Sequence, residues 1–403
     1  FLNNEKTIYR FKIFGKQFFN YIFFEVSIIV LTTLKGGQKM KLNKFLIVGM
    51  SALILSACGG GTGNGAGTLP SGGQAATKEQ AIEAIGNAYE AFLDLDSFEA
   101  NLNLSRVHLD MTSPFYLESE AALDEVAGYG TIEVDVSGKI KAAAKGLASS
   151  DLADLEAEVK VENLNFSLYS GTEIADEVTD DIDVGFEDLD LAAYLKDGGA
   201  YLNIADEEVR DVVQLIAGLG SMEGFPEKIA MLDLIPSEAL PINALLFGLL
   251  SEEMDLPSPE DFVALLPTII DDNVMDMLDD YISLVSYEDG RFGVALDWNK
   301  AKLLEVLGDA LASMEGSSEM LIEIEKCITL NAFKFSLLLD SEGRLSSIKI
   351  DVNGGFDSSK SDVLEGEMGS KGNVIVQTDL SFKYGDDVTV NYPTDLDSYL
   401  PLS

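Results

Sequence analysis

The segment LEAEVKVENLNFSL, residues 155–168, alternates apolar and polar residues over almost its whole length. Its apolar residues recur at every second position up to Val161 and continue from Leu164. A period of two places successive side chains on opposite faces of a strand, so the segment predicts a half-buried antiparallel strand with one wet face. Three further segments alternate in the same way: residues 98–104, 132–136 and 374–384.

Turn signals at three places in the chain predict hairpins. Clusters of Asp and Gly between alternating segments favour tight turns that reverse the chain. Strands are therefore predicted on both sides of each cluster. The three turns are KDGG at residues 196–199, DG at residues 289–290 and DSEG at residues 340–343.

Helical patterns precede these strands and interrupt them. Thr77 can cap a helix, with Gln80 at the capping-box position. Residues 206–282 are predicted to be mainly helical. Within them, residues 239–250 (ALPINALLFGLL) are apolar on nearly every side, so they must be enclosed by protein or by a ligand. Strands and helices together predict an α+β fold.

Residues 40–57 have the three parts of an export signal. Two lysines supply a positive start, residues 45–55 form a short apolar core, and small residues precede Cys58. The core is too short to span a bilayer stably. Its end, LSAC at residues 55–58, resembles the lipobox of bacterial lipoproteins, in which the Cys is acylated and the chain is cleaved before it. We therefore expect a signal peptide at residues 40–57 and lipid attachment at Cys58.

The lipobox divides the chain into regions. Residues 1–39 are expected to be translated spacer, because residues 35–39 can be encoded by a purine-rich ribosome-binding sequence just before the start codon. Residues 58–76 predict a flexible Gly-rich tether with a reach of roughly 23 Å. Residues 77–403 are expected to form a single domain that contains the helical segment 206–282.

The chain is strongly acidic, with 27 Lys and Arg against 69 Asp and Glu and a net charge of −42. Such a surface repels phosphate backbones and anionic lipid head groups, so nucleic acid is excluded as a partner and membrane contact is expected through the acyl anchor. The acidic residues 173–190 lack the Gly-centred spacing of a calcium loop and are interpreted as a solvated loop or edge.

Few residues offer catalytic chemistry. His108 is the only histidine, which excludes multi-histidine metal sites, and its place between Val107 and Leu109 in a predicted strand favours a structural or exposed role. The pattern Ser346-x-x-Lys349 lies in an alternating strand, whereas the β-lactamase motif needs a helix start. No catalytic residue, metal ligand or cofactor is expected, and the protein is not expected to be an enzyme.

The two cysteines of the mature chain are not expected to form an intramolecular disulfide. With Cys58 acylated, Cys327 has no partner. Because it lies at the junction of a predicted helix and a predicted strand, Cys327 is interpreted as a small buried hydrophobic residue.

Several segments in order resemble the LolA/LppX-like superfamily of bacterial lipoproteins. After the lipobox and the tether, they are LDLDSFEANLNL (93–104), KDGGAYLNI (196–204), DSEGRLSSIKIDV (340–352) and VTVNYPTDLDSYLP (388–401). The resemblance implies a strongly curved antiparallel sheet, a half-barrel, wrapped around or covered by helices. It also implies an apolar space that holds acyl chains, and it transfers no catalytic residues.

Two functions follow as hypotheses. The first is a lipoprotein anchored on the outer face of the cell membrane that binds or carries an acyl-like ligand. The second is a non-catalytic surface interaction or structural lipoprotein whose interior is a filled core. In the first, methionines adapt to apolar ligands and flank residues 239–250. The expected ligand-binding residues are Met222, Met231, Leu245, Leu246, Leu249, Met254 and Met277.

Overall fold

A computed structural model of the chain describes the residues that form its sheet and its main helices. The expected leader at residues 1–57, Cys58 and the apolar residues 239–250 lie outside the described residues. The described residues are 69–116, 126–149, 154–174, 177–207, 209–210, 226–231, 263–267, 270, 275, 281–311, 317–361 and 370–401.

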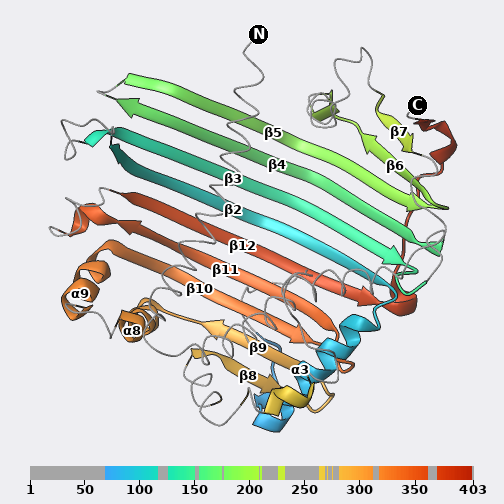
Figure 1. Cartoon of the computed structure of the whole chain (residues 1–403), viewed down its shortest axis with the longest axis horizontal. Helices are drawn as coiled ribbons and strands as arrows, with labels where there is room; N and C mark the ends of the chain where they lie inside the picture. The colour runs from blue at the N-terminus through green and yellow to red at the C-terminus, as the bar shows by residue number, and fades with distance from the viewer. Residues whose placement is uncertain are drawn as a thin grey trace.

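One sheet of thirteen strands dominates the described part of the chain (Figure 1). Neighbouring strands pair antiparallel, except that β13 runs parallel to β7. The sheet is open, with β1 at one edge and β13 at the other. In spatial order the strands are β1 (Gln74–Ala75), β8 (Ser283–Ser286), β9 (Phe292–Asp297), β10 (Ile328–Leu339), β11 (Leu345–Asp357), β12 (Lys371–Tyr384), β2 (Phe98–Tyr116), β3 (Val126–Lys145), β4 (Glu156–Ile174), β5 (Glu177–Lys196), β6 (Gly199–Ile204), β7 (Lys228–Met231) and β13 (Leu400–Pro401).

Helices lie at the margins of this sheet. Figure 1 shows α3 (Lys78–Leu93) near one end of the strands, and α8 (Lys300–Leu311) and α9 (Ser317–Cys327) near the other. Short 3-10 turns occur at Ser358–Lys360, Gly385–Asp387 and Leu396–Ser398. None of the described helices is both long and apolar enough to cross a membrane.

The predicted α+β class, with a half-barrel wrapped around or covered by helices, is therefore wrong. Strand dominates the described residues, and the long central strands β2 to β5 each extend over 19 or 20 residues. The alternating patterns continue through irregular positions, so each strand is much longer than its first run of alternation. Strand β7 also lies inside residues 206–282, which were expected to be helical.

Helix α3 forms where the sequence predicts it. Thr77 Oγ1 accepts a hydrogen bond from the Gln80 amide at 3.3 Å, and Gln80 Oε1 accepts one from the Thr77 amide at 2.8 Å. This capping box confirms the predicted helix start. Small alanines on one face of the helix let it pack closely onto the sheet. The buried cluster contains Ala81, Ala84 and Ala88 of α3 together with Leu337 and Leu339 of β10 and Leu345 and Ile348 of β11.

A segment near the end of the chain packs on part of the opposite face. Residues 388–399, called the C-terminal segment below, run across the right-hand ends of β4 and β5 toward β7 (Figure 1). The Asn391 amide donates to the Glu158 carboxylate at 2.6 Å, and Lys228 of β7 pairs with Asp395 at 2.6 Å. Neighbouring residues of a strand point to opposite faces. Glu158 therefore lies on a polar face of the sheet, and its neighbour Val159 lies on the apolar face.

Candidate functional site: the apolar face of the long strands

Side chains on the apolar face line up in rows across the central strands. The strand register places Leu109 of β2 opposite Val134 of β3 and Val134 opposite Leu168 of β4. It also places Leu168 opposite Val184 of β5. Adjacent strands lie about 4.8 Å apart, so such a row is a continuous apolar strip. Two parallel rows flank it, Val107, Val136, Phe166 and Phe186 on one side and Met111, Ile132, Ser170 and Ile182 on the other.

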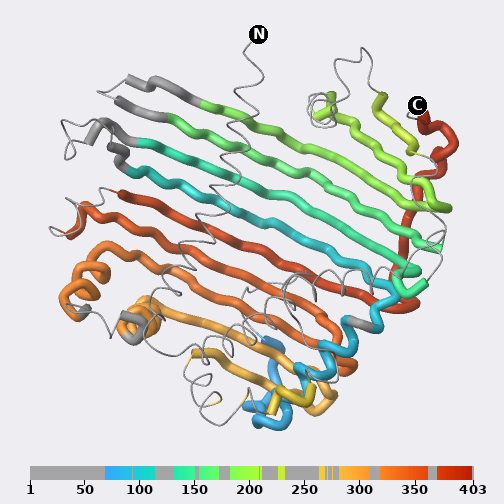
Figure 2. Tube along the Cα trace, viewed as in Figure 1, coloured from blue at the N-terminus to red at the C-terminus, as the bar shows by residue number. Residues whose placement is uncertain are grey.

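The apolar face continues across the other half of the sheet. Phe333 of β10 lies opposite Val352 of β11, which lies opposite Val376 of β12. Figure 2 shows these strands running beside β2 to β5 in one surface. The apolar face therefore spans both groups of long strands.

Bulges keep the apolar residues on this face. The register of β2 shifts between Leu104 and Val107, and that of β4 shifts between Val161 and Leu164. Each pair is three residues apart, which would place its members on opposite faces of a regular strand. The bulge absorbs the extra residue, so both members of each pair face the same side. The apolar face therefore continues past the irregular positions.

Part of this face is exposed. Val159 is 44% exposed, Ile182 is 38% exposed and Val374 is 37% exposed. Register places Val159 in one row with Phe382, which packs against the buried cluster of α3. Exposed apolar side chains gathered on one face mark a surface for a hydrophobic ligand or partner. The geometry therefore suits binding of an apolar chain better than it suits chemistry on a polar substrate.

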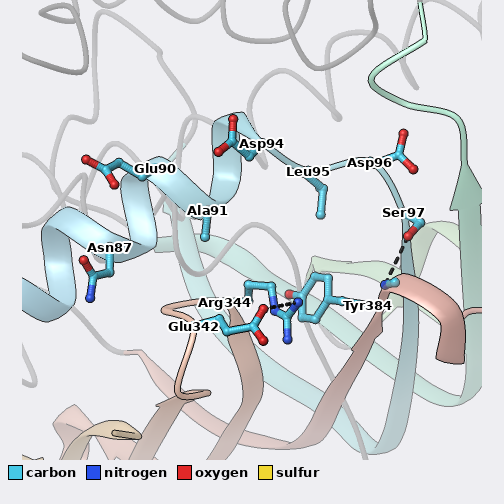
Figure 3. A pocket seen from close by; sticks show the side chains of 11 residues that line it. Asn87, Glu90, Ala91, Asp94, Leu95, Asp96, Ser97, Glu342, Arg344 and Tyr384 are labelled. Carbon is cyan, nitrogen blue, oxygen red and sulfur yellow. Dashed lines mark hydrogen bonds and ion pairs between the residues drawn. The ribbon is translucent and has the colours of Figure 1, made fainter.

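A pocket of about 440 Å³ at the end of α3 has a different character (Figure 3). Glu90, Asp94, Asp96 and Glu342 line it beside a single arginine, Arg344. Arg344 is held by Asp340 at 2.9 Å and by Glu342 at 2.6 Å, and its guanidinium lies 5.0 Å from the centre of the Tyr384 ring. Carboxylates dominate this pocket, so it does not suit an acyl chain.

The structure describes one of the expected ligand-binding residues. Met231 lies in β7, opposite Ala200 of β6, and is half-buried. Cys58 and the other expected residues lie outside the described residues: Met222, Leu245, Leu246, Leu249, Met254 and Met277. Sequence reasoning placed the ligand near the central helical segment and missed the rows on β2 to β5 as a candidate surface. The sequence signal for these rows was the apolar alternation at residues 98–104, 132–136 and 155–168, which lies in β2, β3 and β4.

No family model matches the sequence, and no curated protein matches it. Among solved structures, the chain is similar to a beta-barrel-like protein of a domain of unknown function from Brucella abortus, with 8% identity and a TM-score of 0.12. The match covers 71% of this chain and 98% of that chain.

Proposed function

We propose that this protein is an extracytoplasmic lipoprotein, anchored to the outer face of the cell membrane through Cys58, that binds or carries an acyl-like ligand. The observation that supports the ligand is the set of aligned, partly exposed apolar rows on β2 to β5. The resemblance of the lipobox and of later segments to LolA/LppX-like lipoproteins supports the anchor and the ligand class.

The shape of the surface bears on the strength of binding. An acyl chain gains about 0.8 kcal/mol for each buried CH₂. A chain of about sixteen carbons lying half-buried on an open face would therefore gain roughly 6 kcal/mol, which corresponds to a dissociation constant of tens of micromolar. Such affinity suits a carrier that accepts and releases its ligand more than a store that retains it.

The net charge of the protein affects which head group an acyl ligand can carry. The chain carries a net charge of −42, so an anionic head group near the sheet is repelled. Salt screens this repulsion beyond about 8 Å, which confines it to groups close to the surface. A neutral acyl ligand, such as a monoacylglycerol, is therefore favoured over a free fatty acid.

Two measurements on the full chain test the ligand. Lipid is extracted from the purified protein and identified by mass spectrometry, and a fluorescent monoacylglycerol is titrated into lipid-free protein. Co-purifying acyl lipid and saturable binding are expected. A protein that carries no lipid and does not bind the fluorescent monoacylglycerol would instead be a non-catalytic surface module with a filled core.

Labelling tests the anchor. Cells that express the full chain are fed radioactive palmitate, and the protein is recovered from the membrane fraction. We expect label in the wild type and none in Cys58→Ala. Equal labelling of the two proteins would rule out acylation at Cys58.

A further inference from the structure

A histidine and two carboxylates meet on the polar face of β2 and β3. His108 lies directly opposite Asp135 in the strand register, and its Nδ1 atom is 2.9 Å from Asp135 Oδ1. Glu133 precedes Asp135 by two residues on β3 and therefore points to the same face. One donor atom from each of the three side chains lies within 4.8 Å of the other two.

The surroundings of this cluster carry excess negative charge. Asp110 lies directly opposite Glu133 in the register, and like charges in that position destabilise a sheet. No lysine or arginine among the described residues forms an ion pair with Glu133 or Asp135. A bound cation would offset the repulsion that the strand pairing imposes.

We propose that His108, Glu133 and Asp135 bind a divalent transition-metal ion of the Zn²⁺ type. Imidazole nitrogen combined with carboxylate oxygen suits Zn²⁺ and its neighbours, whereas Ca²⁺ and Mg²⁺ prefer oxygen ligands alone. Bond lengths near 2.1 Å place the donors of a tetrahedral site about 3.4 Å apart. The His108 Nδ1–Asp135 Oδ1 distance of 2.9 Å is already shorter than this, and the three donors lie within 4.8 Å of one another. Small side-chain rotations, chiefly of the exposed Glu133, would therefore bring the donors to the spacing of such a site.

The cluster is open to solvent on one side. Asp135 also lines a hollow of about 410 Å³, together with Ser137 and Ser167 on the neighbouring positions of β3 and β4. Arg106 lines the same hollow from the bulge of β2. The hollow gives an ion access to Asp135, and Glu133 is itself exposed, so water can take the fourth coordination position. A bound ion would also link β2 to β3 through side chains.

Calorimetry on the full chain tests the site. The purified protein is treated with EDTA and desalted, and ZnCl₂ is then titrated in a buffer that does not chelate metal. We expect one ion per chain with micromolar affinity. His108→Ala and Glu133→Gln should each weaken binding at least about tenfold. Glu162→Gln, which removes an exposed carboxylate on β4 outside the cluster, should leave the affinity unchanged.

Two further results decide the identity of the ligands. Co²⁺ bound in place of Zn²⁺ should give the strong visible absorption of a four-coordinate site, and equimolar Ca²⁺ should not displace Zn²⁺. Glu133 is exposed, so Glu133→Gln is expected to fold even if His108→Ala does not. The proposal is overturned by the absence of a stoichiometric ion, by unchanged Zn²⁺ affinity in Glu133→Gln, or by displacement with equimolar Ca²⁺.

Discussion

The carboxylate of Glu158, which is 0% exposed, accepts a 2.6 Å hydrogen bond from the backbone amide of Asn391, more than 230 residues later in the chain. Lys160 lies 2.5 Å from the same carboxylate and Lys141 lies 3.5 Å from it. A buried charge needs such partners, because burial without them costs several kcal/mol. Glu158 therefore fixes the C-terminal segment to the central strands.

Removal of this carboxylate should destabilise the fold. Glu158→Ala leaves Lys160 without its carboxylate and the Asn391 amide without its acceptor, and it removes one of the two carboxylates beside Lys141, which also pairs with Glu99 at 3.6 Å. It is expected to lower the free energy of unfolding by about 3–5 kcal/mol. Urea denaturation measures this change, and limited proteolysis should show faster cleavage within residues 388–399. Glu162→Ala on the same strand changes an exposed side chain and should stay within about 0.5 kcal/mol of wild type. Equal stability of the two variants would contradict the role of Glu158.

Glu99 makes the free energy of unfolding depend on pH in the acidic range. Burial is the largest single influence and tends to raise the pKa of Glu99, but hydrogen bonds from Lys383 and Asn101 and the charge of Lys141 outweigh it. The pKa of Glu99 therefore lies below its ordinary value. A lowered pKa in the folded state stabilises the protein above the unfolded-state pKa of about 4.3, and this stability is lost as the pH falls through the folded-state pKa.

We therefore expect the free energy of unfolding to decrease below about pH 4.3, with part of the decrease due to Glu99. Glu99→Gln removes the titrating group and should be less stable than wild type at pH 7, with a smaller further loss at pH 3. Urea denaturation at the two pH values makes the comparison. An identical loss between pH 7 and pH 3 in both proteins would show that Glu99 does not contribute.

The apolar face offers a matched pair of substitutions. Ile182 and Asp183 are neighbours on β5, both are exposed, and they point to opposite faces. Ile182→Asn should weaken binding of a fluorescent monoacylglycerol by about five- to tenfold, because an apolar contact of about 1 kcal/mol is lost. Asp183→Asn should leave that affinity unchanged. A titration in which both variants bind like wild type would place the ligand elsewhere.

Local patterns in the sequence predicted individual strands better than their assembly. The alternation at residues 155–168 and the hairpin at residues 196–199 both appear, in β4 and in the turn between β5 and β6. The buried position of Cys327 between α9 and β10 is also confirmed. The fold class was wrong because alternation reports which face of a strand is apolar, but not whether helices cover that face.

The cluster at His108 could not be predicted from the sequence for a related reason. His108 and Asp135 are 27 residues apart, and they become neighbours only through the register of β2 and β3. A shift of one residue would move Asp135 to the other face of the sheet. The bulge between Leu104 and Val107 of β2 helps to set that register. The sequence alone does not identify the residue of β3 that lies opposite this bulge.

That residue of β3 is Gly138, which lies opposite Leu104 with a φ of 147°. A Cβ atom there would lie 2.7 Å from the Leu164 Cα atom and 3.0 Å from the Asn163 carbonyl oxygen. Both contacts are with the backbone of β4, so the neighbour cannot move aside by rotating a side chain. The line of bulges across β2, β3 and β4 therefore depends on a glycine at this position.

Gly138→Ala should consequently lower the free energy of unfolding by about 1–3 kcal/mol, as expected for a close contact forced on a packed strand. Gly130 on the same strand is the control, because a Cβ atom there would meet nothing closer than the Ser113 carbonyl oxygen at 3.9 Å. Gly130→Ala should be neutral or stabilise the sheet by up to about 1 kcal/mol, since alanine restricts the unfolded chain. Urea denaturation separates the two variants. If Gly138→Ala were as stable as Gly130→Ala, the register shift beside Gly138 would tolerate a side chain, and the apolar rows would not depend on glycine at this bulge.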